Sequence, residues 1–309
     1  MASRNGSPLR AFRTAALRRG FCLVLLLAAC HRAPAAAPRG PRVVSLAPNV
    51  TEMIYALGAG DLLAGTDVAS DFPPAAKALP KVGNGLTPNI EKIVALRPTL
   101  VVAIAAGLHP NLSRALEAQH IPLLVVRTDR LADVPKAMQR IRDALGRERA
   151  PAIANMLHAL ARQRRTRAKP PRVLFVVWTD PLYIAGRDTF TNDLFDVCGV
   201  RNAASVSGWP QYSLESLIAS PPDLLLYPDH SVSRAQIDAL VARAKLTCAV
   251  VPVDENVFTR PGPRMPEAAA ALNGIVDLHG GQALLPVLGR GTGKRPTTGK
   301  SACPPWSDG

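Results

Sequence analysis

Aromatic residues are scarce in this chain, since Phe, Trp and Tyr make up only 5% of its 309 residues. The core must therefore rest on aliphatic side chains, and an aromatic residue outside the core becomes informative. Cysteine is scarce too, and no CxxC pair occurs among the five cysteines, which argues against a structural zinc site. With 48% hydrophobic residues the chain can still bury an ordinary core, so we expect a folded protein.

An apolar run long enough to cross a membrane is missing from the N-terminal region. The apolar segment 21–29 follows a basic stretch and is shorter than the ~20 residues of a spanning helix. Leu27-Ala28-Ala29-Cys30 resembles a lipobox, in which the cysteine is lipidated and becomes the mature N-terminus. We expect an exported, periplasmic protein, anchored to a bacterial membrane by lipid on Cys30. A simple secretory signal is the alternative, and Sec or twin-arginine export and the choice of membrane stay open.

Acidic residues are fewer than basic ones, and the formal net charge of +14 suggests a polyanionic partner. The distribution of charge argues against this. Five arginines and no acid lie before residue 30, and four basic residues against one acid lie after residue 289. The middle of the chain is therefore only mildly basic, and no Lys/Arg block is interleaved with aromatic residues. We expect no nucleic-acid partner.

Export brings thiols into an oxidising compartment, where they tend to pair. Cys198, Cys248 and Cys303 remain once Cys22 is removed and Cys30 is lipidated. A bridge between Cys198 and Cys248 is one option, because Cys303 falls in the expected tail. Sequence alone leaves this connectivity open.

Short apolar runs alternate with helix-forming stretches from residue 42 onward, which predicts parallel sheets covered by helices. The first run, 43–46, precedes a helix that Asn49 is expected to cap, with Glu52 completing a capping box. Residues 133–168 are almost wholly helix-forming and could cross a domain. The predicted fold class is α/β, with two Rossmann-like lobes of mostly parallel strands joined by one long rigid helix. The expected parts are a lipoprotein signal peptide (1–29), a tether (30–41), an N-terminal lobe (42–145), a linking helix (146–169), a C-terminal lobe (170–288) and a disordered tail (289–309).

An internal echo supports this division. Residues 89–102 and 213–226 share, without a gap, an N-cap residue, an acid, three apolar positions, an alanine, a proline and a buried strand. Glu91 and Glu215 therefore occupy the same position in their lobes. Either acid can simply stabilise the positive end of its helix dipole, by ~0.3–1 kcal/mol. Alternatively, the two carboxylates match a two-fold symmetric partner with one basic socket per subunit.

Several separated motifs, in order over about residues 41–285, resemble the periplasmic binding proteins for cobalamin and ferric siderophores. They read RVVSLAPNVTE (42–52), SDFPP (70–74), NIEKIVALRP (89–98), WPQYSLE (209–215) and NVFTRPGPR (256–264). The resemblance implies a rigid helix between the lobes, a ligand in the cleft, and one glutamate per lobe docking on arginines of a dimeric ABC permease that works with ATPase subunits. Glu91 and Glu215 match those glutamates. We expect a monomer without a cofactor of its own.

Ligands of open α/β sheets sit beyond the carboxyl ends of the strands, so the loops after the predicted strands supply the candidate lining. Trp209 lies between Gly208 and Pro210, a setting that presents a side chain more readily than it buries one. Tyr183 and Arg260 match cleft positions of the family, offering a stacking surface and a charged donor. Core packing is the alternative for Trp209, and Trp178 is divided evenly between cleft and core. The other expected ligand-binding residues are Pro48, Asp67 and Asn84.

The identity of the ligand stays open. Members that bind cobalamin resemble one another in aromatic residues near positions that hold Ala69, Gly85 and Ala105 here, so cobalamin leads only narrowly over a ferric siderophore or heme. The family's inter-helix disulfide is also in doubt, because Cys198 matches one half while Asn273 stands in place of the other.

Two other functional classes compete with the importer reading. A direct transition-metal ion receptor needs three or four clustered ligands, and the histidines are scattered; only His109 and His230 follow predicted strands. A hydrolytic enzyme is disfavoured, because no Gly-x-Ser-x-Gly elbow and no triad occurs. We therefore expect a binding protein and not an enzyme.

Overall fold

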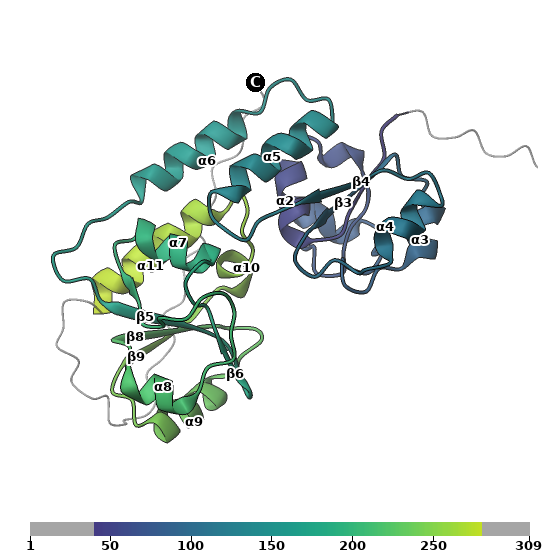
Figure 1. Cartoon of the computed structure of the whole chain (residues 1–309). Coiled ribbons are helices and arrows are strands. Elements are labelled where there is room, and N and C mark those ends of the chain that lie inside the picture. The colour runs from purple at the N-terminus through teal and green to yellow at the C-terminus, as the bar shows by residue number, and fades with distance from the viewer. Residues whose placement is uncertain (1–39, 280–309) are drawn as a thin grey trace, which may run out of the picture. The chain divides into compact units, whose positions relative to one another are not determined.

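The computed structural model describes residues 40–279 (Figure 1). The expected signal peptide, the lipidation site Cys30, nearly all of the tether, and everything after residue 279, including Cys303, lie outside these residues. Within residues 40–279, no helix combines the length and the apolar character that crossing a membrane requires.

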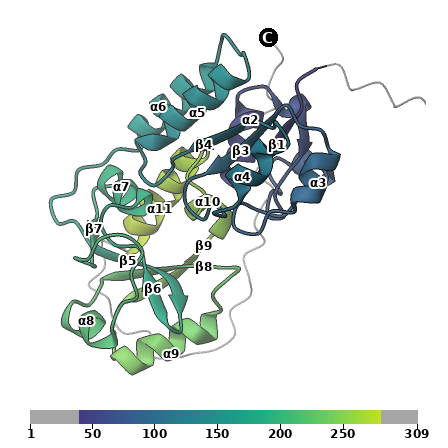
Figure 2. The same ribbon diagram turned by 45° about the vertical axis from the view of Figure 1, so that its right-hand side comes forward.

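The first sheet has four strands in the order β2-β1-β3-β4, and all neighbouring strands are parallel. Its strands are β1 (Val43–Ser45), β2 (Leu63–Gly65), β3 (Leu100–Ile104) and β4 (Leu123–Val126). Helices α2 (Pro48–Ala56) and α5 (Asp133–Ala144) cover one face, and α3 (Ile90–Ala95) and α4 (Leu112–Glu117) cover the other (Figures 1 and 2). Two short 3-10 helices, Gly60–Leu62 and Pro74–Ala78, lie in the connections. Aliphatic side chains fill both cores, as the composition predicts.

The second sheet repeats this arrangement with one addition. The order is β6-β5-β8-β9, with β7 also pairing with β5, and only β6 is antiparallel. Its strands are β5 (Arg172–Thr179), β6 (Leu182–Ile184), β7 (Arg201–Asn202), β8 (Leu224–Pro228) and β9 (Ala249–Val253). Helices α7 (Phe190–Val197), α10 (Glu255–Phe258) and α11 (Met265–His279) lie on one face, and α8 (Leu214–Ala219) and α9 (Arg234–Ala244) on the other (Figure 1). The predicted α/β class is confirmed.

The helix-forming stretch 133–168 is not one continuous helix. It forms α5 and a separate 12-residue helix, α6 (Pro151–Arg162). The break has two local causes: Gly146 adopts a positive φ of 63°, and Pro151 begins α6, where its missing N–H costs nothing. Helix α6 still links the two sheets, because Ile153 and Met156 enter a core of the first sheet while Leu160 packs against a core of the second.

The predicted capping box at Asn49 is wrong. Helix α2 begins at Pro48, with Ala47 as its N-cap, so Asn49 and Glu52 lie inside the helix and both are buried. A capping box does occur at Ser233 and Gln236, at the start of α9. Proline fits the first helical turn, so Asn49 and Glu52 fall inside the helix. Their side chains belong to the site described below.

The internal echo is confirmed in three dimensions. Asn89 caps α3 by accepting the Lys92 N–H at 2.9 Å, and Ser213 caps α8 by accepting the Ser216 N–H at 3.0 Å. Glu91 and Glu215 are each the second residue of a six-residue helix, and both are exposed. In both halves the helix is followed by a buried parallel strand.

Cys198 and Cys248 are free and do not form the bridge considered above. They belong to core clusters on opposite faces of the second sheet, so the sheet itself separates them. Asn273, at the family's second cysteine position, is buried and donates from Nδ2 to the Gln163 carbonyl at 2.8 Å. Its Oδ1 accepts from Arg167 Nη2 at 3.2 Å, and Arg167 Nε also bonds to the Cys198 carbonyl. Hydrogen bonds thus join these segments where the family's disulfide was in doubt.

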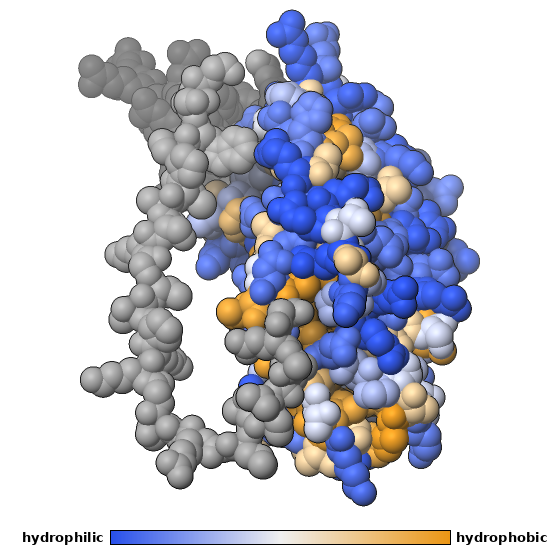
Figure 3. All heavy atoms as spheres, turned by 90° about the vertical axis from the view of Figure 1, so that its left-hand side faces the viewer, coloured by the Kyte–Doolittle hydropathy of each residue, from blue (hydrophilic) through white to orange (hydrophobic). Residues whose placement is uncertain are grey.

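Hydrophilic residues cover most of the described surface on the face shown in Figure 3, and hydrophobic residues are gathered in smaller patches there. This agrees with a folded middle that carries charges of both signs. The informative apolar side chains are therefore the few large ones that the structure leaves exposed.

Candidate ligand-binding site

Loops from both sheets meet at the carboxyl ends of their parallel strands. The Asn49 side chain, just after β1, donates from Nδ2 to Thr128 Oγ1 at 3.3 Å and to the Pro261 carbonyl at 3.1 Å. Thr128 follows β4 of the first sheet, whereas Pro261 follows α10 of the second. Asn49 is only 2% exposed, so this junction is a buried one.

A buried carboxylate anchors the junction. Glu52 on α2 accepts two bonds from Arg264, from Nε at 2.8 Å and from Nη2 at 2.6 Å. The Glu52 side chain is 2% exposed and that of Arg264 is 11% exposed. Burial lowers the pKa of Arg264, but bonding to Glu52 and its charge prevail, so the pKa lies above its ordinary value. The Phe72 ring lies 4.3 Å from the guanidinium carbon, which adds a cation–π contact.

Arg260 joins the same cluster from the loop after α10. Its Nη1 lies 2.6 Å from Asp71 Oδ1 and 3.5 Å from Glu52 Oε1, and its Nη2 donates to the Ala69 carbonyl at 3.1 Å. The structure therefore brings Arg260 to the carboxyl ends of the first sheet, with its guanidinium already engaged by protein groups. Its ligand-binding role stays a prediction.

Asp67 lies in the loop after β2 and is 1% exposed. Its carboxylate accepts the Ala69 N–H at 3.0 Å and the Ser70 hydroxyl. Burial raises the pKa of Asp67, while these bonds and the charges of Lys81 and Arg260 oppose the rise. The carboxylate serves to shape the loop that carries Asp71 in this structure, and its predicted contact with a ligand is not tested.

Asn84 and Pro48 also have local roles. Asn84 Oδ1 accepts the backbone N–H groups of Leu86 and Thr87 at 2.9 and 2.7 Å, so it closes a turn. Pro48 is half-buried and begins α2. Asn84 therefore lies in a turn between β2 and β3, whereas Pro48 belongs to α2 and not to the loop that was predicted.

The second sheet contributes a row of exposed aromatic side chains. Trp178 at the end of β5 and Tyr183 in β6 are cross-strand partners, and Tyr183 in turn pairs with Gln211. Directly paired residues project from the same face of a sheet, so these three side chains lie side by side. Trp178 is 42% exposed and Tyr183 is 37% exposed. The choice left open for Trp178 is thus resolved in favour of the surface.

Trp209 extends this row and is 44% exposed. It is two residues from Gln211, and its ring centroid lies 5.4 Å from that of the buried Phe190. Close backbone contact positions its segment: Gly186 donates its N–H to the Gly208 carbonyl at 2.8 Å, and a Cβ on Gly186 would collide with the Val206 carbonyl oxygen. Core packing is therefore not the role of Trp209, whose ring is fixed on one side and open on the other. We call Trp178, Tyr183 and Trp209, which lie around Gln211, the aromatic row.

Comparison with known proteins identifies the family of this chain. A family model described as periplasmic binding protein matches residues 43–247, two thirds of the chain. The chain belongs to the periplasmic binding protein family. It is 33% identical over 242 residues to the vitamin B12-binding protein of Pectobacterium atrosepticum, which covers 74% of this chain and 85% of that protein.

Solved structures of periplasmic binding proteins share this fold. A heme-binding protein of Pseudomonas aeruginosa superposes with a TM-score of 0.68 at 27% identity, covering 79% of this chain and 94% of the other. The vitamin B12-binding protein of Vibrio cholerae gives 0.64 at 26% identity, covering 78% and 98%. The chain is thus a periplasmic binding protein, as its curated and solved relatives are, and not an enzyme. Members of this family work with an ABC permease and its ATPase.

Sequence reasoning about this periplasmic binding protein missed the charged cluster. Glu52 was read as part of a helix cap, and Asp71, Phe72 and Arg264 received no role. A signal was present, because all four residues fall within the matched motifs 42–52, 70–74 and 256–264. Their pairing depends on contacts between segments about 190 to 210 residues apart, as between Glu52 and Arg264. Local patterns carry no such information.

A possible cation-binding cluster was missed as well. Asp229 and Asp254 directly follow the paired strands β8 and β9, and His230 comes next to Asp229. One ligand atom from each of the three lies within 4.8 Å of the others, and all three residues are exposed. His109 lies elsewhere, in a pocket of about 370 Å³ with Leu86 and Leu112.

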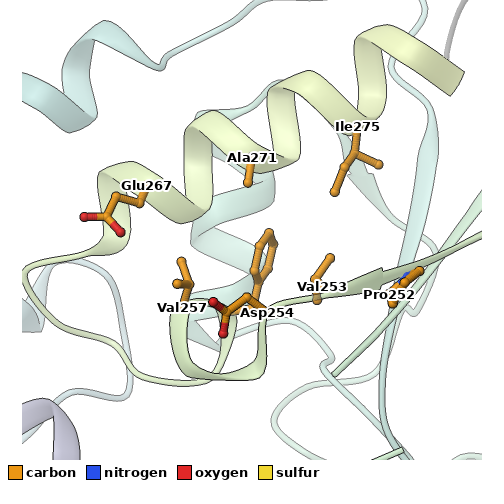
Figure 4. A pocket seen from close by; sticks show the side chains of 8 residues that line it. Pro252, Val253, Asp254, Val257, Glu267, Ala271 and Ile275 are labelled. Carbon is orange, nitrogen blue, oxygen red and sulfur yellow. The ribbon is translucent and has the colours of Figure 1, made fainter. Parts of the chain in front are cut away.

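A second pocket, of about 310 Å³, lies between β9, α10 and α11 (Figure 4). Apolar side chains such as Val253, Ala271 and Ile275 line most of it, while Asp254 and Glu267 place their carboxylates at one end (Figure 4). Burial raises the pKa of Glu267, opposed by the charge of Arg264 and reinforced by Glu52 and Asp254. None of the predicted ligand-binding residues lines this pocket.

Proposed function

We propose that this protein is the substrate-binding lipoprotein of an ABC importer and captures cobalamin or a related metal chelate. The aromatic row carries this proposal. Three large aromatic side chains are exposed on one side of a chain that has few aromatic residues, and none is needed to close a core. Stacking on such side chains suits a large planar ligand better than a bare ion.

The choice among chelates rests on the relatives. Vitamin B12 is named for the matched protein of Pectobacterium atrosepticum and heme for the structure from Pseudomonas aeruginosa. Both ligands are metal-bearing macrocycles, and the aromatic row suits either. Cobalamin is our first proposal, with heme or a ferric siderophore as the alternative. The protein would need no cofactor of its own.

Delivery of the ligand to the permease would use Glu91 and Glu215 as docking residues. Each carboxylate is exposed in the first turn of its helix, and the two helices are equivalent elements of the echoing halves. Hydrogen bonds to its own backbone and to Ser213 lower the pKa of Glu215 below its ordinary value, so the charged form is favoured further. A dimeric permease with one arginine socket per subunit is the partner that fits such a pair.

Attachment to the membrane would come from lipid on Cys30, as the lipobox-like sequence indicates. We propose that the mature protein is a monomer held at a bacterial membrane in the periplasm. Mass spectrometry of the protein purified from membranes tests this: a diacylglyceryl mass on Cys30 is expected. Cleavage elsewhere without lipid would contradict it.

Titration of the mature protein, followed by tryptophan fluorescence, tests the ligand. The probes are cyanocobalamin, hemin, ferrichrome and zinc chloride. We expect saturable quenching by one of the three chelates, because a bound macrocycle would lie close to Trp178 and Trp209. No response to any chelate, together with a response to zinc, would contradict the proposed function.

A second candidate function, direct capture of a transition-metal ion, has one observation in its favour. Asp229, His230 and Asp254 offer two carboxylates and an imidazole, which suit ions such as Zn²⁺. Against it, Asp229 and Asp254 already accept the N–H groups of Glu255 and Asn256 at 3.2 and 2.8 Å. The zinc titration repeated on His230→Ala separates this candidate from the first.

A further inference from the structure

Arg260 contacts two carboxylates, which differ in their distance from it and in their exposure to water. Asp71 lies 2.6 Å from its Nη1 and Glu52 lies 3.5 Å away. The Asp71 side chain is 44% exposed, that of Glu52 is 2% exposed, and that of Arg260 is 11% exposed. The closer partner of Arg260 is therefore also the one that water can reach.

The Glu52 side of the cluster is fixed. Its carboxylate is buried and takes both bonds of a parallel fork from Arg264, so separating them would leave an uncompensated charge in the interior. Phe72 covers the guanidinium of Arg264, and Arg264 Nη2 also donates to the Asn256 carbonyl at 3.0 Å. Nothing comparable confines Asp71.

Another anion can replace Asp71 as the partner of Arg260. Water can solvate the half-exposed carboxylate of Asp71 when it leaves, and Arg260 keeps Glu52 and the Ala69 carbonyl as partners. Burial raises the pKa of Asp71, but bonding to Arg260 and the charge of Arg260 outweigh it and hold the pKa below its usual value. The Asp71 carboxylate paired with Arg260 is thus charged at neutral pH. The four charges of the cluster balance, and any replacement must also be an anion.

The position of Arg260 suits a ligand contact. Arg260 follows β9 and α10 of the second sheet, and Ala69 and Asp71 follow β2 of the first. All these segments lie beyond the carboxyl ends of parallel strands, where open α/β sheets bind their ligands.

We propose that Asp71 is a specificity-determining residue, whose carboxylate holds the place on Arg260 that an acidic group of the ligand takes. The inference rests on the proposed function and narrows it: the ligand is a metal chelate that presents an anionic oxygen to Arg260, which the carboxylates of heme and the phosphodiester of cobalamin can both supply. A chelate without an anionic group has nothing to exchange for Asp71. Asp71 therefore lowers the affinity of every ligand whose acidic group must displace it, and only a ligand whose contact with Arg260 is stronger than that of Asp71 takes its place.

Hemin and its dimethyl ester provide matched probes, because they differ only in two carboxylates. In Asp71→Asn, the internal competitor is lost, so we expect hemin to bind about tenfold more tightly and the ester to be unchanged. In Arg260→Gln, hemin should lose about tenfold or more while the ester is again unchanged. Asp238→Asn, which removes the acid of an exposed Arg–Asp pair on α9, is the control for a simple change of net charge.

The result that overturns the proposal is an equal effect of Asp71→Asn on the acid and the ester, or no effect on either. A second measurement does not depend on heme. Citrate should raise the melting temperature of Asp71→Asn in a saturable way, with a smaller effect on wild type and none on Asp71→Asn with Arg260→Gln. Identical citrate curves for all three proteins would overturn the proposal. If wild type binds none of the chelates, the proposed function fails, while the citrate curves still decide the role of Asp71.

Discussion

The carboxyl ends of the two sheets are built from different side chains, although the sheets carry echoing units. In the first half, polar residues at or near the strand ends are buried, as with Ser45, Thr51, Thr66 and Ser70, all at most 2% exposed. In the second half, Trp178, Tyr183 and Trp209 are exposed at 42%, 37% and 44%. Large apolar side chains are exposed in the first half too, at Val68, Phe72 and Leu86, so the contrast lies in the paired aromatic side chains of the second half.

Hydrogen-bond requirements explain the first half of this contrast. Buried polar groups must find partners, and here Thr51 Oγ1 bonds to Ser45 and Ser70 while Lys81 Nζ donates to Thr66 and to two carbonyl groups. Exposed aromatic side chains indicate a binding surface instead, because their apolar area lies in water and adds nothing to the stability of the fold. The two halves thus share a common design but differ in the side chains near the ends of their strands.

The halves are alike at α3 and α8, and that likeness supports the largest predicted effect. Changing Glu91 and Glu215 together to Lys should abolish uptake, because each permease socket would meet a repelling charge. Radiolabelled uptake of the ligand found by titration measures this. Affinity of the purified variant should equal that of wild type, and a loss of affinity would show that these carboxylates serve the pocket or the fold.

Removing the buried anchor of the first half should have the next largest effect. We expect Glu52→Ala to lower the free energy of unfolding by about 3–5 kcal/mol, because it leaves Arg264 buried without its partner. Urea denaturation measures the change. Asp61→Asn, which breaks the exposed pair with Arg147, is the control and should cost below about 1 kcal/mol. Equal costs would erase the distinction between a buried anchor and a surface pair.

Truncating the aromatic row should affect binding and leave stability nearly unchanged. For Trp209→Ala we expect a loss of ~1–3 kcal/mol in ligand binding, as for buried aromatic anchors. Calorimetric titration measures it, with Ile218→Ala, another exposed apolar residue, on α8, as the control. Unchanged titration heats for Trp209→Ala would remove this residue from the site.

The smallest effect concerns the two thiols of the second half. Burial raises the pKa of Cys198 to about 12 and that of Cys248 to about 11. An unfolded thiol ionises near about pH 8.5, so above that pH the unfolded chain loses protons that the folded chain keeps, and folding stability falls slightly as the pH rises. Alkylation followed by mass spectrometry should show slow labelling near about pH 8 in the native protein and rapid labelling in urea. Rapid native labelling would place a thiol at the surface.

Much of the fold was predictable because its signals are local. Asn89 and Ser213 predicted two capped helices, and the apolar runs at 100–104 and 224–227 predicted buried strands. The errors also had local causes. A run of good helix formers hid the break at Gly146, and Asn49 looked like a cap although Pro48 already began the helix. The antiparallel strand β6 is only three residues long and gave too weak a pattern to be recognised.

By itself, the sequence determined the α/β class, the two echoing halves, the matching positions of Glu91 and Glu215, and the family. Periodicity, caps and ordered motifs encode these within short stretches of chain. Only the tertiary structure decided that Trp178 and Trp209 are exposed, that Cys198 and Cys248 are kept apart, and that Arg260 and Arg264 share Glu52. Exposure and ion pairing depend on which distant segments come together, and no local pattern specifies that.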